Sequence, residues 1–126
     1  MRKIVAFFVF VLFVGLAATA RSQCRTMDRN IEKPLKLTRA RSAVVRDTIR
    51  VCTSHTYRFK AARGKLLGLR LTTGDKTSMT LLPPSGEALV DGGLVWSGRL
   101  TESGEYEIQI GTDATARYTL TVTIRE

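Results

Sequence analysis

Residues 105–125 read EYEIQIGTDATARYTLTVTIR, and this stretch decides the fold. In its first part Tyr106, Ile108 and Ile110 alternate with polar residues, and in its second part apolar residues recur at every other position from 118 to 124. Because successive side chains of a strand point to opposite faces, each part predicts a β-strand with one buried face. These are the two strongest strand predictions in the chain.

The same period of two extends toward the amino terminus. It predicts further strands at residues 43–51, 55–61, 67–71, 77–83 and 94–100, and a short one at 35–37. Turn sequences separate them, among them Arg63-Gly64, Pro83-Pro84-Ser85-Gly86 and Asp91-Gly92-Gly93. Seven or eight short strands about ten residues apart predict an all-β fold, a single antiparallel, jelly-roll-like β-sandwich over residues 42–126.

The first twenty residues have the composition of a secretory signal peptide. Two basic residues precede an apolar run at 4–16, and small residues follow at 17–20. Cleavage after Ala20 leaves 126 − 20 = 106 residues, the size of one domain. We therefore expect an exported protein, periplasmic or secreted, without a membrane span in its mature form.

The two cysteines, Cys24 and Cys52, predict a disulfide. An even number of cysteines in an exported chain favours pairing. Closing a loop of about 28 residues contributes roughly 3 kcal/mol in the chain-entropy model. The bond would tie residues 21–41, a basic N-terminal arm, to the sandwich.

Positive charge is unevenly distributed along the chain. The formal net charge of +9 becomes 18 − 11 = +7 without residues 1–20, and residues 21–70 hold 14 of the basic residues against three acids. Such a segment could meet nucleic acid, anionic lipid or polysaccharide. Export and the lack of aromatic residues from 25 to 50 argue against nucleic acid. A solvated basic face is the simplest interpretation.

No set of residues predicts catalysis, a metal site or a cofactor. His55 is the only histidine, and in a strand its side chain and that of Ser54 would point to opposite faces. We expect a partly exposed histidine at a strand edge. Glu102, Glu105 and Glu107 surround a turn where neither a glycosidase cleft nor a calcium site is expected. These features predict a binding protein and not an enzyme.

Four segments together resemble a known family. They are YRFKAARGKLLGLRLTT from residue 57, TLLPPSGEAL from 80, WSGRLTESGEYEIQIG from 96 and YTLTVTI from 118. The chain resembles the bacterial pre-peptidase C-terminal-like β-sandwich and, within that group, the exported inhibitors of invertebrate-type and goose-type lysozymes. Residues 103–106, Ser-Gly-Glu-Tyr, match the SGxY motif of those inhibitors.

The resemblance implies a lysozyme as the protein partner. It implies that the loop at 103–106 enters the active-site cleft, with Ser103 and Tyr106 in contact with the enzyme. Gly104 would allow the tight turn, and Glu105 would be the variable position. Arg117, in the neighbouring turn, is a weaker candidate for pairing with a catalytic carboxylate.

Two alternatives remain open. A Ser-Gly turn followed by a core tyrosine also serves a purely structural role, in which Tyr106 packs beside Ile108. The alternative function is a binding module for envelope or anionic polysaccharide, or for peptidoglycan, that uses a basic N-terminal face around Arg39, Arg41 and Arg46. Trp96 could stack on a sugar, but its alternating apolar neighbours favour a place in the core.

Overall fold

The computed structural model describes residues 29–38, 41–74 and 76–126. Within these ranges the chain forms β-strands and no helix, so no segment there could cross a membrane as a helix. The predicted signal peptide, Cys24 and Arg39 lie outside the described residues, and the disulfide to Cys52 stays a prediction. The strands are β1 (Arg29–Lys33), β2 (Ser42–Ile49), β3 (Thr53–Ala61), β4 (Leu66–Thr73), β5 (Thr77–Leu82), β6 (Val90–Gly93), β7 (Val95–Arg99), β8 (Gly104–Thr112) and β9 (Ala116–Arg125).

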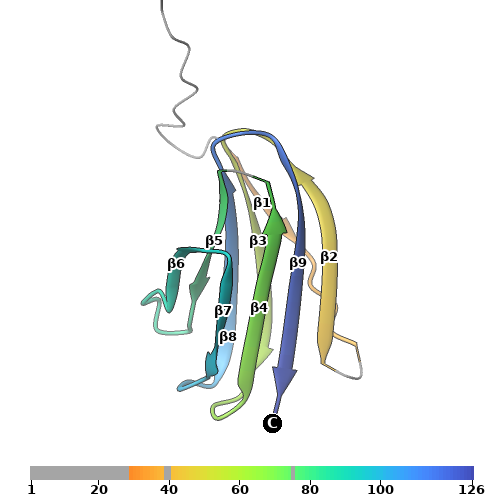
Figure 1. The fold of residues 1–126 in the computed structure, drawn as a ribbon. Coiled ribbons are helices and arrows are strands. Elements are labelled where there is room, and N and C mark those ends of the chain that lie inside the picture. Colours follow the sequence, from red (N-terminus) through yellow and green to blue (C-terminus); the bar gives the residue numbers. More distant parts are fainter. Residues whose placement is uncertain (1–28, 39–40, 75) are drawn as a thin grey trace, which may run out of the picture.

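The strands form two sheets that face each other as two layers (Figure 1). One sheet has five strands in the order β1-β3-β8-β5-β6, and the other has four in the order β2-β9-β4-β7. The all-β prediction is therefore confirmed. The turn between β8 and β9 passes from one layer to the other, so these consecutive strands belong to different sheets.

The core lies between the two sheets and follows the alternation of the sequence. Tyr106, Ile108 and Ile110 of β8 point inward, as do Tyr118, Leu120, Val122 and Ile124 of β9. Fully burying one aliphatic or aromatic side chain contributes about 1.5–3 kcal/mol, so these rows supply much of the driving force for folding. The prediction of both strands is confirmed.

The first strand corrects the antiparallel prediction. β1 pairs with β3 in parallel, from Arg29 opposite Thr53 to Lys33 opposite Tyr57. The chain passes through β2 in the other sheet between these strands, and so returns to the first sheet in the original direction. The predicted strand at 35–37 was wrong. Pro34 cannot donate to a ladder, and the following leucines pack against the core without strand pairing.

The strand count was also too low, because β6 forms where a turn was predicted. Val90–Gly93 pairs with β5, and the register shifts between Met79 and Thr80. Gly92 has φ +80°, which a glycine adopts without strain. The sequence Asp91-Gly92-Gly93, which is typical of a turn, can therefore also form a short irregular strand.

Candidate functional site

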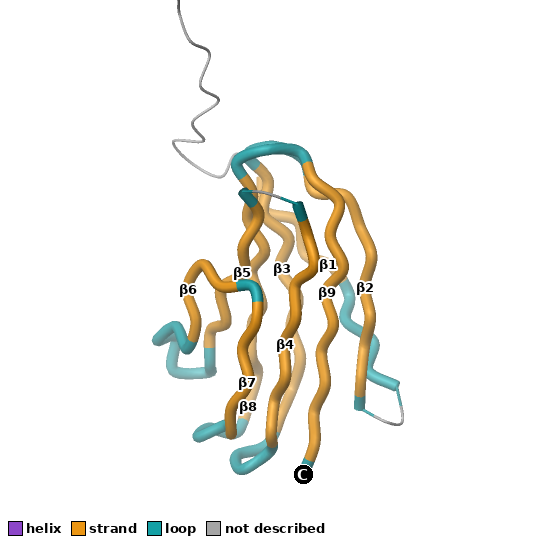
Figure 2. The backbone as a smooth tube through the Cα atoms, viewed as in Figure 1, coloured by secondary structure: helices purple, strands orange, loops and turns teal. Residues whose placement is uncertain are grey.

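The residues of the SGxY motif lie at one end of the molecule, as does the loop between β3 and β4 (Figure 2). We call residues 100–104 the serine loop, and the loop between β5 and β6 also contacts it, through Ser85. The amide of Gly64 donates to the carbonyl of Leu100 at 2.7 Å, and the amide of Leu100 donates to the carbonyl of Lys65 at 2.8 Å. The serine loop is thus fastened to its neighbour by a reciprocal pair of backbone hydrogen bonds.

Ser103 is exposed at the tip of the serine loop. Its Oγ accepts a hydrogen bond from the amide of Arg63 at 2.8 Å. A serine hydroxyl carries one proton and two lone pairs, so this contact leaves the Ser103 proton available to a partner. The side chain is therefore both oriented by the protein and able to donate outward.

Gly104 follows at a position that other residues would not fit. Its φ is +143°, and a Cβ placed there would lie 2.9 Å from Cγ of Pro84. The loop between β5 and β6 thus packs directly against the start of β8. A side chain at this position would push the serine loop away from its neighbour.

Tyr106 is buried, which favours the structural role among the two roles that the sequence leaves open. Its exposed fraction is 0%, and its ring stacks on Phe59 with centroids 5.6 Å apart. The hydroxyl donates to the carbonyl of Glu102 at 2.6 Å, and burial raises the pKa of the phenol. Because alternation sends Glu105 and Glu107 outward, Tyr106 points into the core. Its hydroxyl braces the serine loop from within.

The acidic residues around the serine loop have partners. Glu105 and Glu107 lie 3.8 and 3.7 Å from the guanidinium of Arg58, which also pairs with Glu32 at 2.9 Å. The carboxylate of Glu102 accepts a hydrogen bond from Ser85 at 2.8 Å. These contacts hold the surface around the loop in one arrangement.

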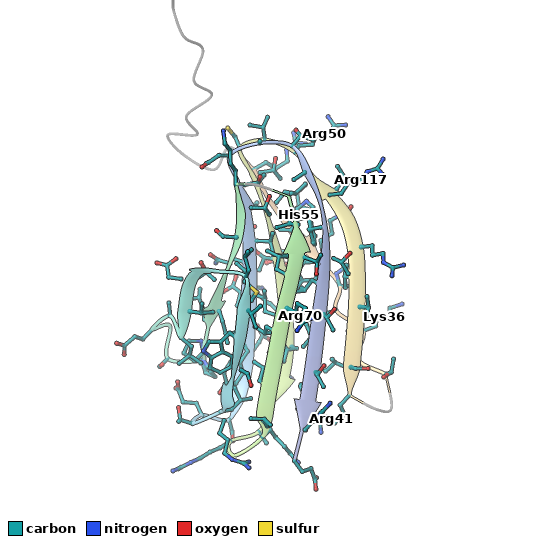
Figure 3. All side chains as sticks on the ribbon, in the orientation of Figure 1. Lys36, Arg41, Arg50, His55, Arg70 and Arg117 are labelled. Atoms are coloured by element: carbon teal, nitrogen blue, oxygen red, sulfur yellow. The ribbon has the colours of Figure 1, made fainter. Side chains whose placement is uncertain are left out.

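Arg117 lies at the opposite end of the molecule (Figure 3). It belongs to the start of β9 and pairs with Thr48. β8 has nine residues, and at ~3.3 Å per residue Arg117 is about 26 Å from the serine loop. The expectation that it lies in a turn beside the motif was wrong. The turn that precedes Arg117 joins β8 to β9, and it lies at the end of the molecule remote from the motif.

His55 is buried, with an exposed fraction of 2%, and is not the partly exposed residue we expected. Its Nδ1 lies 2.7 Å from the hydroxyl of Tyr118, which lies 2.5 Å from that of Tyr57. Burial lowers the pKa of the imidazole, although Asp47 at 3.9 Å opposes this shift. Burial alone would raise the pKa of Asp47, but hydrogen bonds from Lys33 and the Thr48 amide lower it overall.

This cluster links the two sheets, and Ser54 is not part of it. Ser54 lies on the outer face of its strand and donates to Asn30 at 3.0 Å, as the opposite orientation of Ser54 and His55 predicted. The hydrogen-bond partner of His55, Tyr118, stands 63 residues away and in a different sheet. No local pattern could have indicated them.

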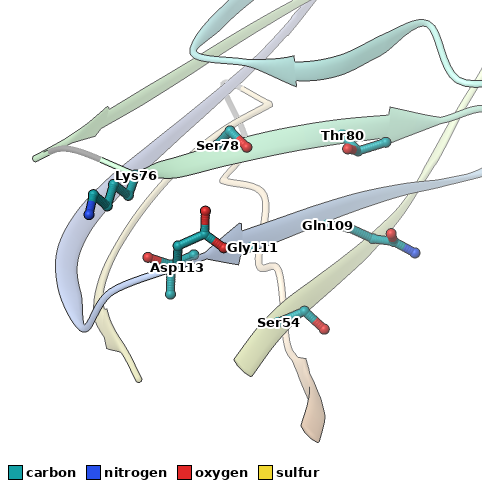
Figure 4. Close-up of a pocket in the computed structure, with 8 residues that line it drawn as sticks. Ser54, Lys76, Ser78, Thr80, Gln109, Gly111 and Asp113 are labelled. Carbon is teal, nitrogen blue, oxygen red and sulfur yellow. The ribbon is translucent and has the colours of Figure 1, made fainter. Parts of the chain in front are cut away.

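A shallow cavity of about 250 Å³ lies on the outer face of the five-stranded sheet (Figure 4). Its lining is mostly polar and lies toward the end remote from the serine loop. No group of three or more metal-ligating side chains occurs in the described part of the chain. The cavity is lined by Ser54, Lys76, Ser78, Thr80, Gln109, Gly111, Thr112 and Asp113.

Comparison with known proteins gives structural neighbours only. No family model and no curated protein matches the chain. A solved structure from Aeromonas hydrophila, PliG, described as a periplasmic inhibitor of g-type lysozyme, superposes with a TM-score of 0.70 at 20% identity, over 77% of this chain and 98% of that one. The chain has the PliG fold.

Two further neighbours extend this result. PliG of Salmonella Typhimurium, also described as a periplasmic inhibitor of g-type lysozyme, gives a TM-score of 0.55 at 18% identity, covering 77% of this chain and 99% of that one. The pre-peptidase C-terminal domain of Bacillus anthracis collagenase gives 0.59 at 12% identity, covering 75% and 94%. The resemblance drawn from the sequence is confirmed at the level of the fold.

Proposed function

We propose that the chain is an exported, periplasmic binding protein that inhibits a lysozyme, of the g-type named for its structural neighbours. The single observation that carries the proposal is the serine loop at the start of β8, which presents an exposed Ser103 and is fixed by two backbone hydrogen bonds at Leu100 and three that involve side chains. A loop that is already ordered loses little conformational entropy on binding. This is the property that an inhibitor of a cleft requires.

In this proposal Ser103 is the contacting residue and donates its hydroxyl proton to an active-site carboxylate. Lysozymes hydrolyse glycosidic bonds with carboxyl groups, which are natural acceptors for such a donor. Tyr106 acts through the carbonyl of Glu102 and positions the loop. Arg117 has no part, because it lies at the far end. Glu105 flanks the contact and favours a basic enzyme surface.

The test is an inhibition titration of the exported chain against g-type, invertebrate-type and chicken-type lysozymes acting on peptidoglycan. Ser103→Ala should raise the inhibition constant for the g-type enzyme by about tenfold, since it removes one charge-assisted hydrogen bond. The matched control is Thr115→Ala, since the Thr115 hydroxyl also accepts a backbone amide, that of Val51 at 3.1 Å, at the opposite end.

Tyr106→Phe separates positioning from contact. It should weaken inhibition and also lower the melting temperature, whereas Ser103→Ala should affect chiefly inhibition. Alanine is unsuitable at 106 because emptying this core position costs about 3–5 kcal/mol. Failure to inhibit any of the three lysozyme classes would overturn the proposal, as would an equal loss of inhibition in Thr115→Ala.

A further inference from the structure

Among the described residues, arginine is the only charged type on the outer face of the four-stranded sheet. Alternation places one outward-facing row on each strand, and the rows otherwise consist of threonine, serine, glycine, valine and Leu66. We call this surface the arginine face. All its arginines are exposed: Arg46 on β2, Arg70 on β4, Arg99 on β7, and Arg117 and Arg125 on β9.

Strand register spreads these arginines along the whole face. Arg99 and Arg125 flank Leu66 at the end near the serine loop. Arg70 stands in the middle, level with Thr121, and Figure 3 labels it over β4. Arg117 stands at the other end, eight residues from Arg125, so the charged row is about 26 Å long.

The arginines lack acidic partners in the described part of the chain. None of the ion pairs there includes any of the five, and Arg99 donates only to the carbonyl of Gly64 at 2.9 Å. Asp47, the acid of β2, points inward to Lys33 at 2.8 Å. Positive charges gathered without counter-charges repel one another and create a field that attracts an anion.

A groove runs along the middle of the arginine face. Gly68 forms its floor, because a glycine leaves the space of a side chain empty; a Cβ there would have no neighbour closer than 3.9 Å. Two adjoining hollows of about 400 and 210 Å³ share Gly68, Ser97 and Thr123 in their linings. Arg70 lines one hollow and Arg125 the other. The groove thus offers hydroxyl groups between two guanidinium groups.

We propose that the arginine face binds an acidic polysaccharide lying along this groove. Serine and threonine hydroxyls exchange hydrogen bonds with sugar hydroxyls, and the arginines pair with the acid groups of successive units. Stacking of nucleic-acid bases requires exposed aromatic rings, and Trp96, the aromatic residue that lines one of the hollows, is partly buried and packs against the core. Membrane insertion requires large apolar side chains, whereas Val44 and Val95 are the exposed apolar residues of this face.

The test is calorimetric titration of the exported chain with oligogalacturonate of about ten units, with neutral dextran of equal length as the control. Binding should weaken steeply as salt rises. Arg70→Gln/Arg125→Gln should lower the affinity at least about tenfold, since it removes two charge-assisted contacts. The matched control, Lys60→Gln/Lys76→Gln, removes the same charge from exposed Lys60 of β3 and Lys76 just before β5, and should bind as the parent does.

Gly68→Thr distinguishes the groove from general electrostatic attraction. It fills the floor, leaves the net charge unchanged and suits a strand, so the melting temperature should hold while affinity falls about tenfold. Ser103→Ala should bind normally, which keeps this test separate from lysozyme inhibition. Unchanged affinity in Gly68→Thr would overturn the proposal, as would equally tight binding of duplex DNA or anionic phospholipid vesicles.

Discussion

The two outer faces of the molecule differ in whether their charged side chains lie beside charges of opposite sign. On the five-stranded sheet Arg58 lies within 4 Å of Glu32, Glu105 and Glu107, so opposite charges are paired there. On the four-stranded sheet no acidic residue of the described ranges forms an ion pair with the arginines. β8 and β9 are consecutive, yet β8 carries acids to one face and β9 carries arginines to the other, because the turn between them changes layers. Charge summed along the sequence therefore says little about charge on a surface.

The largest effect on stability is expected from a change in the core that joins the two sheets. Tyr118→Phe removes a hydroxyl that serves both His55 and Tyr57 in the buried space between the sheets. We expect the unfolding free energy to fall by about 2–3 kcal/mol, measured by guanidinium denaturation. Tyr106→Phe, which loses one bond to a backbone carbonyl, should cost only about 1 kcal/mol. Equal losses would contradict the central role of Tyr118.

A smaller effect is expected from pH. Burial lowers the pKa of His55 below its ordinary value of 6.5, so the unfolded chain takes up the proton first. Stability is therefore full above pH 6.5 and declines as the pH falls from there toward the lower pKa of the folded state. Denaturation at pH 7.5 and 5.0 measures the decline, and Asp47 stays ionised across this range. His55→Gln should be less sensitive to pH; an unchanged dependence would assign it to another group.

Arg58→Gln removes the ion pairs on the outer face of the five-stranded sheet. This change leaves Glu32, Glu105 and Glu107 without their shared cation. Because Arg58 is about half exposed, the expected loss of unfolding free energy is only about 1 kcal/mol at low salt. Thermal denaturation at rising salt measures it, since screening should shrink the difference between variant and parent. A salt-independent loss would indicate that packing, and not charge, is responsible.

An ion pair can be added to the outer face of the four-stranded sheet. Thr121→Glu places a carboxylate opposite Arg70 on the neighbouring strand. We expect a gain of about 0.5 kcal/mol from the cross-strand pair, measured by denaturation, together with loss of oligogalacturonate binding. Thr121→Gln supplies the same shape without the charge and should give no gain. A destabilised Thr121→Glu would show that repulsion among the arginines is negligible.

The sequence predicted best what is local. The alternation at 105–125 predicts both strands and their inward residues, because burial on one face of a strand has a period of two. It could not predict the parallel pairing of β1 with β3, because this pairing depends on the intervening strand β2 joining the other sheet. Pairing across layers also explains why His55 was misjudged, since its partner Tyr118 comes from the opposite sheet.

The candidate site was predicted in part. Residues 103 and 104 form a projecting loop, as the motif suggested. For Tyr106 the motif implied contact with a partner, whereas the alternation with Ile108 and Ile110 favoured the core, and its ring is buried. Arg117 was close in sequence and distant in space because a full strand separates it from the motif. The arginine face was missed, since strands from both halves of the chain contribute to it.

The strand order also governs when the protein can fold. β8 pairs with β3 and β5 in one sheet, and β9 pairs with β2 and β4 in the other. Among the strands of the described residues these two come last in the sequence, yet β2, β3, β4 and β5 all pair with them. Neither sheet can assemble while β8 and β9 are missing, so folding begins late and long-range pairing makes it slow. Because these pairings join residues far apart in the sequence, we expect refolding from denaturant to be slow.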